Sequence, residues 1–361
     1  MLLLSNDDVQ TILDMPLCLE ALEAGYRDLL SQEAAYGAKF NFWVPQDDGD
    51  GSFRFSSMEG ASRRLGVFAI RMKLDILQWP GEQTEEKYCI EPGTFCGLIL
   101  LVSTKNAEPL ALVQDGHLQH MRVGGCSGLG VKYLARPDAS IVGMLGSGGM
   151  ARTSLQAFCQ VRDIREVRVF SPTREHREAY AEEMSRDLDI DVRAVDDPRE
   201  AVRGADILSV CTDAIQPVMS ADWVEPGMHV TNIGGGLDPR VRERADVIVK
   251  LGYGSPDKSV PVGEGGFGGD IYLGRPEELA RNPKYRRSRE GGETVKQPHL
   301  VDLMAGRATG RTTDEQITYF IDEGTQGLQF AAVGGAVYQA ARDRELGRKL
   351  PTEWLVQNIR D

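Results

Sequence analysis

Short apolar runs alternate with segments of helical periodicity from residue 140 onward. Between helical segments such as 176–188, strands are predicted at 141–145, 167–170, 192–195, 205–211, 228–233 and 247–251. Continuous apolar runs of this length are typical of parallel strands that helices cover on both faces. This part of the chain is therefore predicted to form a doubly wound α/β domain.

The residues before 140 follow a different pattern. A helix is predicted at 14–32, and strands are predicted at 52–56, 67–76, 96–103 and 109–113. A helix followed by turn-separated strands indicates an α+β region with an antiparallel sheet. At the other end of the chain, a helix at 299–304 and a strand at 316–321 precede a final helix from Thr325. Its many Ala and Gly residues indicate close packing, with the first region as one candidate partner.

Length and charge limit the possible functions. A chain of 361 residues exceeds the usual size of one hydrophobic core, so two domains are expected. A net charge of -13 repels nucleic acids and anionic membranes, so a small molecule is the expected partner. Because the sequence shows neither a long apolar run nor a basic export signal, we expect a cytoplasmic protein. The cysteines lack CxxC or metal-ligand spacing, which predicts reduced thiols and no metal site.

A glycine-rich turn joins the first strand of the α/β series to its helix. Gly146, Gly148 and Ala151 have the G-x-G-x-x-A spacing of the dinucleotide-binding fingerprint. The first Gly permits a tight turn, the second lets the backbone approach a pyrophosphate, and the Ala lets helix and strand pack closely. A glycine-rich connection without a ligand is the alternative, but the strand–helix–strand context favours a Rossmann domain that binds NAD or NADP.

The end of the second strand bears on the choice of cofactor. NAD sites usually place Asp or Glu there to bind the ribose 2′-hydroxyl, whereas this chain has Ser171, Thr173 and Arg174. These side chains suit a 2′-phosphate, so NADP is favoured. NAD stays possible because Arg174 could be an ordinary solvated charge. The predicted cofactor-binding residues are Gly146, Ser147, Gly148, Gly149, Met150, Ser171, Thr173, Arg174, Thr212 and Gly234.

Three cations stand in apolar or glycine-rich surroundings. Arg71 and Lys73 are two positions apart in a predicted strand and so share one face, although a solvent-facing pair is the ordinary explanation. Arg122 is expected just before a helix with several glycines, which indicates a close approach to that backbone. His117 and His120 flank Arg122 and could donate a proton, but a turn at the helix entry explains them more simply.

Several stretches together resemble the ornithine cyclodeaminase/μ-crystallin family. They read EPLALVQDGHLQHMR, GVKYLA, GMLGSGGMA, ADILSVCT, PGMHVTNIGG and GTQGLQFAAVGGAVYQAA. The resemblance implies a homodimer and two domains in each chain. Residues 1–121 and 308–361 would form the α+β substrate-binding and dimerisation domain. Residues 122–307 would form the Rossmann domain, with an insertion at 253–298.

The resemblance also implies a binding site for a substrate carboxylate. Lys73 and Arg122 would hold it beside the nicotinamide, and Arg71 could join them. Two positions depart from the family pattern. Val123 stands where the family has a phosphate-binding Thr, so backbone N–H groups of Gly124 or Gly125 could replace that contact. Another family Arg falls near Lys39 or Asn41, and Lys39 or Arg71 could replace it.

A third departure bears on the reaction. The family's cyclodeaminases have a catalytic Asp after a Gly-Gly pair, whereas here Gly236 holds that position and Asp238 follows two residues later. Unless Asp238 takes its place as a catalytic residue, a base is missing. We therefore expect an NAD(P)-dependent oxidoreductase that reduces a carboxylate-bearing imine to an amino acid, or the reverse, with Lys73 or water as proton donor. A cyclodeaminase-type lyase and a non-catalytic NAD(P)-binding or ligand-binding protein are the alternatives.

Overall fold

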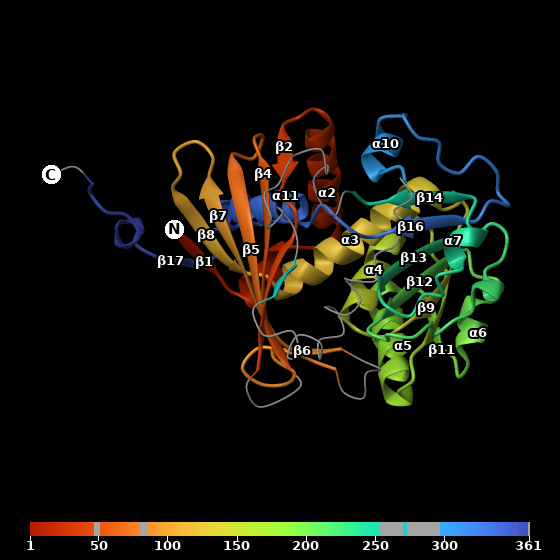
Figure 1. Ribbon diagram of the computed structural model, residues 1–361. Coiled ribbons are helices and arrows are strands. Elements are labelled where there is room, and N and C mark those ends of the chain that lie inside the picture. Colours follow the sequence, from red (N-terminus) through yellow and green to blue (C-terminus); the bar gives the residue numbers. More distant parts are fainter. Residues whose placement is uncertain (47–50, 80–84, 253–269, 273–296, 360–361) are drawn as a thin grey trace.

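The computed structural model describes residues 1–46, 51–79, 85–252, 270–272 and 297–359. Two β-sheets lie on opposite sides of the molecule, and the helix α3 (Gly116–Leu134) runs between them (Figure 1). The predicted insertion at 253–298 lies mostly outside the described residues. The predicted fold class, a parallel doubly wound sheet beside a second α+β sheet, is confirmed.

The sheet built from both chain ends has ten strands in the order β15-β3-β4-β5-β7-β8-β1-β17, with β2 paired to β4 and β6 paired to β5. Its strands are β1 (Leu2–Leu4), β2 (Ala34–Tyr36), β3 (Phe40–Pro45), β4 (Ser52–Ser62), β5 (Val67–Gln78), β6 (Glu86–Tyr88), β7 (Cys96–Ser103), β8 (Pro109–Gln114), β15 (Asp270–Tyr272) and β17 (Arg348–Lys349).

One face of this ten-stranded sheet packs against helices. The helices on that side are α1 (Asn6–Ile12), α2 (Met15–Leu30) and α11 (Gln326–Asp343). Helix α11 lies directly on the sheet because Gly327 has no side chain. A Cβ atom at that position would stand 1.7 Å from the carbonyl oxygen of Glu59. The final helix therefore packs against the first region, as its small residues suggested.

The second sheet has seven strands, all parallel, in the order β11-β10-β9-β12-β13-β16-β14. They are β9 (Ile141–Leu145), β10 (Glu166–Phe170), β11 (Asp191–Ala194), β12 (Ile207–Thr212), β13 (His229–Gly234), β14 (Val247–Lys250) and β16 (Thr318–Ile321). Its helices are α4 (Gly149–Val161), α5 (Arg174–Leu188), α6 (Pro198–Val202), α7 (Val241–Arg244) and α10 (Leu300–Met304). Separate apolar clusters cover the two faces of the sheet, which explains the continuous apolar strands.

The sequence pattern misses several elements of the first region. The predicted antiparallel sheet is in fact mixed, since β1 pairs in parallel with β8, and β15 with β3. Strands of three residues, such as β1 and β2, are too short to show a period of two. The expected boundary at 307/308 would also place Thr318–Ile321 with this sheet, but that strand pairs with β13 and β14 in the parallel sheet.

The structure differs from two sequence-based expectations for helix α3. It begins at Gly116, so Arg122 lies inside the helix and not before it. Its glycines do allow a close approach, but the groups that approach belong to neighbouring helices and not to a ligand. A Cβ atom on Gly124 would lie 2.3 Å from the backbone of Thr153 in α4, and one on Gly125 would lie 2.7 Å from Leu22 in α2. Both glycines also lie in the interior of α3, where backbone N–H groups donate to the carbonyls four residues earlier, so they do not replace the missing phosphate contact.

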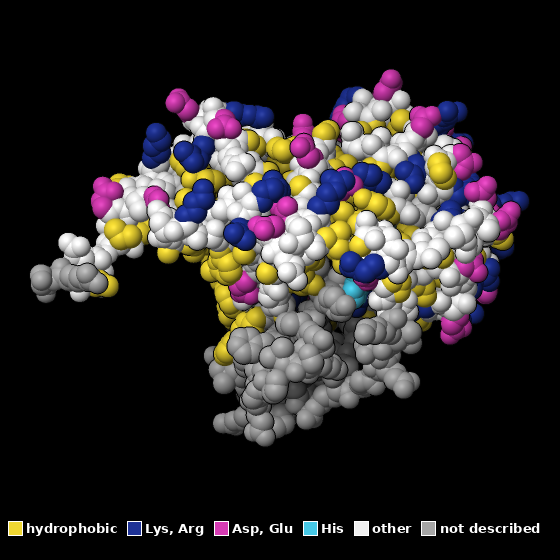
Figure 2. Space-filling model, turned by 90° about the horizontal axis from the view of Figure 1, so that it is seen from above, with side chains coloured by type: hydrophobic (Ala, Val, Ile, Leu, Met, Phe, Trp, Pro, Cys, Tyr) yellow, Lys and Arg dark blue, Asp and Glu magenta, His cyan; other side chains and the backbone are white. Residues whose placement is uncertain are grey.

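The surface on the face shown in Figure 2 carries Lys, Arg, Asp and Glu side chains in a mixed distribution. The chain's last described segment extends away from the body (Figure 1) and includes a short 3-10 turn, Thr352–Trp354, with Trp354 exposed. None of the described helices is long and apolar enough to cross a membrane. All six cysteines are free thiols, and Cys18 and Cys126 are buried.

Candidate functional site

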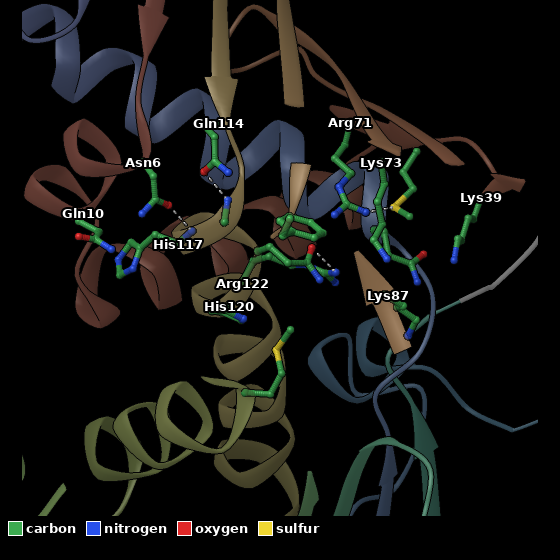
Figure 3. A pocket seen from close by; sticks show the side chains of 16 residues that line it. Asn6, Gln10, Lys39, Arg71, Lys73, Lys87, Gln114, His117, His120 and Arg122 are labelled. Carbon is green, nitrogen blue, oxygen red and sulfur yellow. Dashed lines mark hydrogen bonds between the residues drawn. The ribbon is translucent and has the colours of Figure 1, made fainter. Parts of the chain in front are cut away.

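A pocket of about 780 Å³ opens between the two sheets (Figure 3). Both the ten-stranded sheet and helix α3 contribute to its wall, and Met150 at the start of α4 connects it to the glycine-rich turn. Its lining residues are Asn6, Gln10, Lys39, Met58, Arg71, Lys73, Lys87, Phe95, Gln114, Gly116, His117, Gln119, His120, Arg122, Met150 and Gln326. We call this cavity the cation pocket, because none of the described residues that line it is Asp or Glu.

Arg71 is the most deeply buried cation of the pocket. Its side chain is 2% exposed, and its Nε donates to Oδ2 of Asp115 at 2.5 Å. Asp115 is fully buried directly before α3, so the ion pair joins the sheet to the helix. Among the described residues, the Nη2 atom of Arg71 has no hydrogen-bond partner. A buried, unsatisfied guanidinium nitrogen is costly, and a ligand carboxylate in the pocket could satisfy it.

Lys73 follows two positions later on the same strand and reaches the same pocket, as the period of two predicts. Its Nζ lies 2.9 Å from Oδ1 of Asp75 and over the ring of Phe95. Arg54 donates to the other oxygen of Asp75 at 2.5 Å. Burial is the main cause that lowers the pKa of Lys73 well below its usual value, and the positive charge of Arg54 lowers it further.

Arg122 reaches the pocket from α3 and is held by amides. Its Nη2 donates to Oε1 of Gln119 at 2.8 Å, and its Nη1 donates to Oε1 of Gln329 at 2.7 Å. Burial lowers the pKa of Arg122, although a guanidinium stays charged at neutral pH. The ring of Phe330 lies 5.0 Å from the guanidinium carbon of Arg122 and 5.3 Å from that of Arg71. One aromatic side chain therefore contacts two of the three predicted carboxylate-binding cations.

A buried polar network fixes Gln329 on α11. Its Nε2 donates to the hydroxyl of Tyr26 at 3.2 Å, to the carbonyl of Gly324 at 3.1 Å and to the hydroxyl of Thr325 at 3.0 Å. The hydroxyls of Tyr26 and Thr325 lie 2.8 Å apart. With its amide nitrogen held in this way, Gln329 presents its oxygen to Arg122. The network therefore sets the direction of the guanidinium.

The glycine-rich turn, residues 146–150, is shaped to accept a phosphate. Gly146 has φ +111, and a Cβ atom there would stand 2.0 Å from the carbonyl oxygen of Cys211. Gly148 is the N-cap residue of α4, and a Cβ atom there would meet none of the described residues within 4 Å. Among the described residues, no side chain caps the first N–H groups of this thirteen-residue helix. This arrangement fits the diphosphate of a dinucleotide.

The other predicted cofactor residues lie along the same edge of the parallel sheet. The hydroxyl of Ser147 donates to that of Ser171 at 2.9 Å and ties the turn to the end of β10. Thr173 and Arg174 start α5, where Arg174 is 69% exposed and bonded to Glu178 at 2.7 Å. Thr212 ends β12 and Gly234 ends β13, and a bridge between Thr212 and Gly235 joins them.

Asp238 lies outside the cation pocket. Its carboxylate accepts from the backbone N–H of Ala221 at 2.9 Å and from the backbone and side chain of Arg240. These bonds, with that of the Arg240 side chain strongest, hold the pKa of Asp238 far below its usual value. A carboxylate so fully occupied connects two loops and is poorly suited to act as a base. The structure does not bring Asp238 together with Lys73 and Arg122.

Sequence reasoning missed several residues that support the site. The acids Asp75 and Asp115, the amide Gln329 and the ring of Phe330 all contact predicted cations. A sequence signal for Gln329 was its position among small and apolar residues in LQFAAVGG. His117, His120 and Lys39 do line the pocket. The ring nitrogen Nε2 of His117 bonds to the carbonyl of Leu13 at 2.9 Å, which is the structural role expected of a helix entry.

Comparison with known proteins identifies the family to which the chain belongs. The model of the ornithine cyclodeaminase/mu-crystallin family matches residues 83–344. The chain belongs to this family. The resemblance inferred from the sequence motifs is thereby confirmed.

Relatives in this family include proteins named as cyclodeaminases and as reductases. An uncharacterized cyclodeaminase of Sinorhizobium fredii is 30% identical over 310 residues, which cover 84% of this chain and 84% of that protein. A Δ1-pyrroline-2-carboxylate reductase of Bacillus cereus is 28% identical over 269 residues, or 71% of this chain and 74% of that one. The solved structure of the Thermococcus litoralis Δ1-pyrroline-2-carboxylate reductase, in complex with NADH and L-proline, superposes with a TM-score of 0.77 at 25% identity. It covers 97% of this chain and 100% of that one.

Proposed function

We propose that the protein interconverts a carboxylate-bearing imine and the corresponding amino acid, with NADH or NADPH as the redox partner. The observation that carries this proposal is the meeting of Arg71, Lys73 and Arg122 in one pocket that also reaches Met150 of the glycine-rich turn. Such cations can orient a carboxylate beside a dinucleotide bound at that turn. The names of the pyrroline-2-carboxylate reductases support the same reaction class.

The reaction adds one hydride and one proton to a carbon–nitrogen double bond. When bound, the dinucleotide supplies the hydride to the imine carbon and is itself oxidised. The electron pair of the double bond passes to nitrogen, which takes the proton. Lys73 suits this donor role because its buried ammonium loses a proton more readily than an exposed one. Arg71 and Arg122 keep their charge and hold the carboxylate, and in the reverse direction neutral Lys73 accepts the proton.

We favour NADPH over NADH as the natural partner. The positions after β10 hold Ser171, Thr173 and Arg174, with no carboxylate before Glu175. Arg174 is exposed at the first turn of α5, where its guanidinium could exchange Glu178 for a 2′-phosphate. The hydroxyl of Ser171 is already bonded to Ser147, so it supports the turn more than the cofactor. NADH binding stays possible with the same glycine-rich turn.

A cyclodeaminase-type lyase is the second candidate, and the name of the Sinorhizobium relative favours it. The position of Asp238 does not, because its carboxylate is bonded to Ala221 and Arg240, away from the pocket. Among the described residues, the pocket lining has no carboxylate that could act as the base. We therefore place the lyase behind the reductase.

The deciding experiment follows the absorbance of NADPH and NADH when the purified protein meets Δ1-pyrroline-2-carboxylate and acyclic 2-imino acids made from 2-oxo acids and ammonia. Net oxidation of the dinucleotide is expected. Release of ammonia from L-ornithine without net formation of NADH would indicate the lyase. Dinucleotide binding without turnover of any substrate would indicate a non-catalytic binding protein and contradict the proposal.

We further propose that two copies pair through the ten-stranded sheet. Burial alternates along β5 and β7, and the half-buried side of these strands carries Phe68, Ile70, Leu98 and Leu100. An apolar sheet face of this kind is typical of a protein interface. The division of labour between a substrate domain and a Rossmann domain stays a prediction. A cytoplasmic location is also our proposal, and the six unpaired cysteines support it.

A further inference from the structure

The cation pocket holds more positive charge than one carboxylate needs. Lys87 on β6 and Lys39 also line it, beyond the two arginines assigned to the substrate's carboxylate and the proton donor Lys73. In Figure 3, Lys39, Lys73 and Lys87 lie on the side of the view opposite Asn6, Gln10 and His117. The lining is therefore basic on one side and neutral or imidazole-bearing on the other.

Counting the charges around the pocket supports this asymmetry. The acids that contact its cations are Asp75, Asp115 and Glu85, of which Glu85 lies 2.6 Å from Nζ of Lys87. Against these three acids stand five cations: Arg54, Arg71, Lys73, Lys87 and Arg122. Lys39 is left out of this count. Within the described residues, the surplus is two positive charges. Asp322 near Arg122 reduces it only in part, because burial raises the pKa of Asp322 to about 7.

A surplus of this size in a protein of net charge -13 calls for an anionic ligand. One carboxylate would neutralise half of it. Lys87 is close enough to Lys73 for its charge to lower the pKa of Lys73 further, so the repulsion is felt inside the site. A second anionic group on the substrate would relieve that repulsion.

Building on the proposed function, we propose that the substrate is a dicarboxylic 2-imino or 2-amino acid, whose second carboxylate binds on the side of the pocket that Lys87 lines. Its first carboxylate binds Arg71 and Arg122, and its nitrogen faces Lys73. Lys87 is 40% exposed, so it can turn from Glu85 to a ligand at small cost. The reaction stays the same balanced transfer of a hydride and a proton, since the second carboxylate does not react.

Matched substrates test this proposal. The kcat/KM for L-aspartate and L-glutamate should exceed that for L-alanine and L-2-aminobutyrate by about tenfold or more, which corresponds to one good charge contact. In Lys87→Gln, this ratio should fall toward one, because only the dicarboxylic substrates lose a charge contact. Any effect of the lost charge on the pKa of Lys73 acts on both substrate classes and cancels in the ratio. The control Lys105→Gln, in the exposed turn after β7, should leave the ratio unchanged. Equal kcat/KM values for the two substrate classes, or an unchanged ratio in Lys87→Gln, would overturn it.

Binding separates this inference from the proposed function. By calorimetry, succinate should bind the wild-type protein about tenfold more tightly than butyrate, and Lys87→Gln should remove the difference. Succinate binding can be measured even if the protein reduces no imine. In that case the proposed function would be wrong, and the inference about the second carboxylate would still be tested. Weaker NADPH binding in Lys87→Gln with unchanged succinate binding would mean that this lysine serves the cofactor, and the inference would be wrong.

Discussion

The Nζ atom of Lys73 lies 2.9 Å from Oδ1 of Asp75, and the same carboxyl group also binds Arg54. Asp75 therefore keeps a cationic partner when Lys73 is replaced, so the fold should survive. We expect Lys73→Met to lower kcat/KM for imine reduction by roughly a hundredfold or more, the range of a lost general acid. Steady-state kinetics measures this, and fluorescence titration should show unchanged NADH binding.

The pH profile gives an independent check on Lys73. Imine reduction needs the ammonium form, so the rate should fall as pH rises through a pKa below the ordinary lysine value of 10.5. Lys105→Met serves as the surface control. A Lys73→Met variant with kcat/KM within about threefold of wild type would show that water delivers the proton instead.

Gln329 is predicted to act on the substrate only through Arg122. In Gln329→Leu, the guanidinium loses the acceptor at 2.7 Å, and a hydrogen bond to a charged group contributes about 1.5–3 kcal/mol. We expect KM for the carboxylate substrate to rise by about tenfold or more, with a smaller change in kcat. The exposed Gln160→Leu on α4 is the matched control. A fall in kcat with unchanged KM would contradict the positioning role.

How far the sequence could predict this site depends on the separation of the residues. Arg71 and Lys73 were placed on one face because a strand has a period of two, and both do line the pocket. The bond between Arg122 and Gln329 joins residues 207 positions apart, and no local pattern links them. The glycines of α3 show the opposite case. Their signal of close approach was correct, but only the fold shows that Thr153 and Leu22 are what approaches.

The fold was predicted unevenly for a similar reason. The strands of the parallel sheet are buried on both faces and give apolar runs such as 141–145, which match β9 to the residue. Strand β1 has three residues and finds its place only by pairing with β8, more than a hundred residues away. Tertiary pairing of this kind leaves no trace in a short sequence window.

Gly148→Ala should weaken NADH binding without destabilising the fold. Within the part of the chain that the structure describes, a Cβ atom at Gly148 meets no atom within 4 Å, and the φ of Gly148 is -82, so Gly148→Ala should keep the wild-type melting temperature. The added methyl group would occupy the space proposed for the diphosphate, so the Kd for NADH should rise by about tenfold or more. Calorimetry measures the Kd for NADH in Gly148→Ala and in the control Gly310→Ala. A Cβ atom at Gly310 would be in ordinary contact with its neighbours. Tight NADH binding by Gly148→Ala would argue against the proposed cofactor site.

Arg174 tests the preference for NADPH. Because its side chain is 69% exposed and bonds to Glu178 on the protein surface, Arg174→Ala should leave stability nearly unchanged. The ratio of kcat/KM with NADPH to that with NADH should fall by about tenfold, through the NADPH value alone. Arg186→Ala, at the other end of α5 and 68% exposed, is the matched control. An unaltered ratio would mean that Arg174 is an ordinary solvated charge.

Asp322 should make stability depend on pH in the direction opposite to most carboxyl groups. Its Oδ2 accepts from the hydroxyl of Ser127 at 2.8 Å, and burial raises its pKa from 3.8 to about 7. Between these values the folded protein binds more protons than the unfolded chain, so this group lowers stability as pH rises from about 4 to about 7. Asp322→Asn cannot ionise. Its melting temperature should therefore fall less than that of wild type between about pH 5 and about pH 8, whereas the exposed control Asp163→Asn should follow wild type. If Asp322→Asn and wild type lose the same number of degrees, the carboxyl is already ionised in the fold at the lower pH.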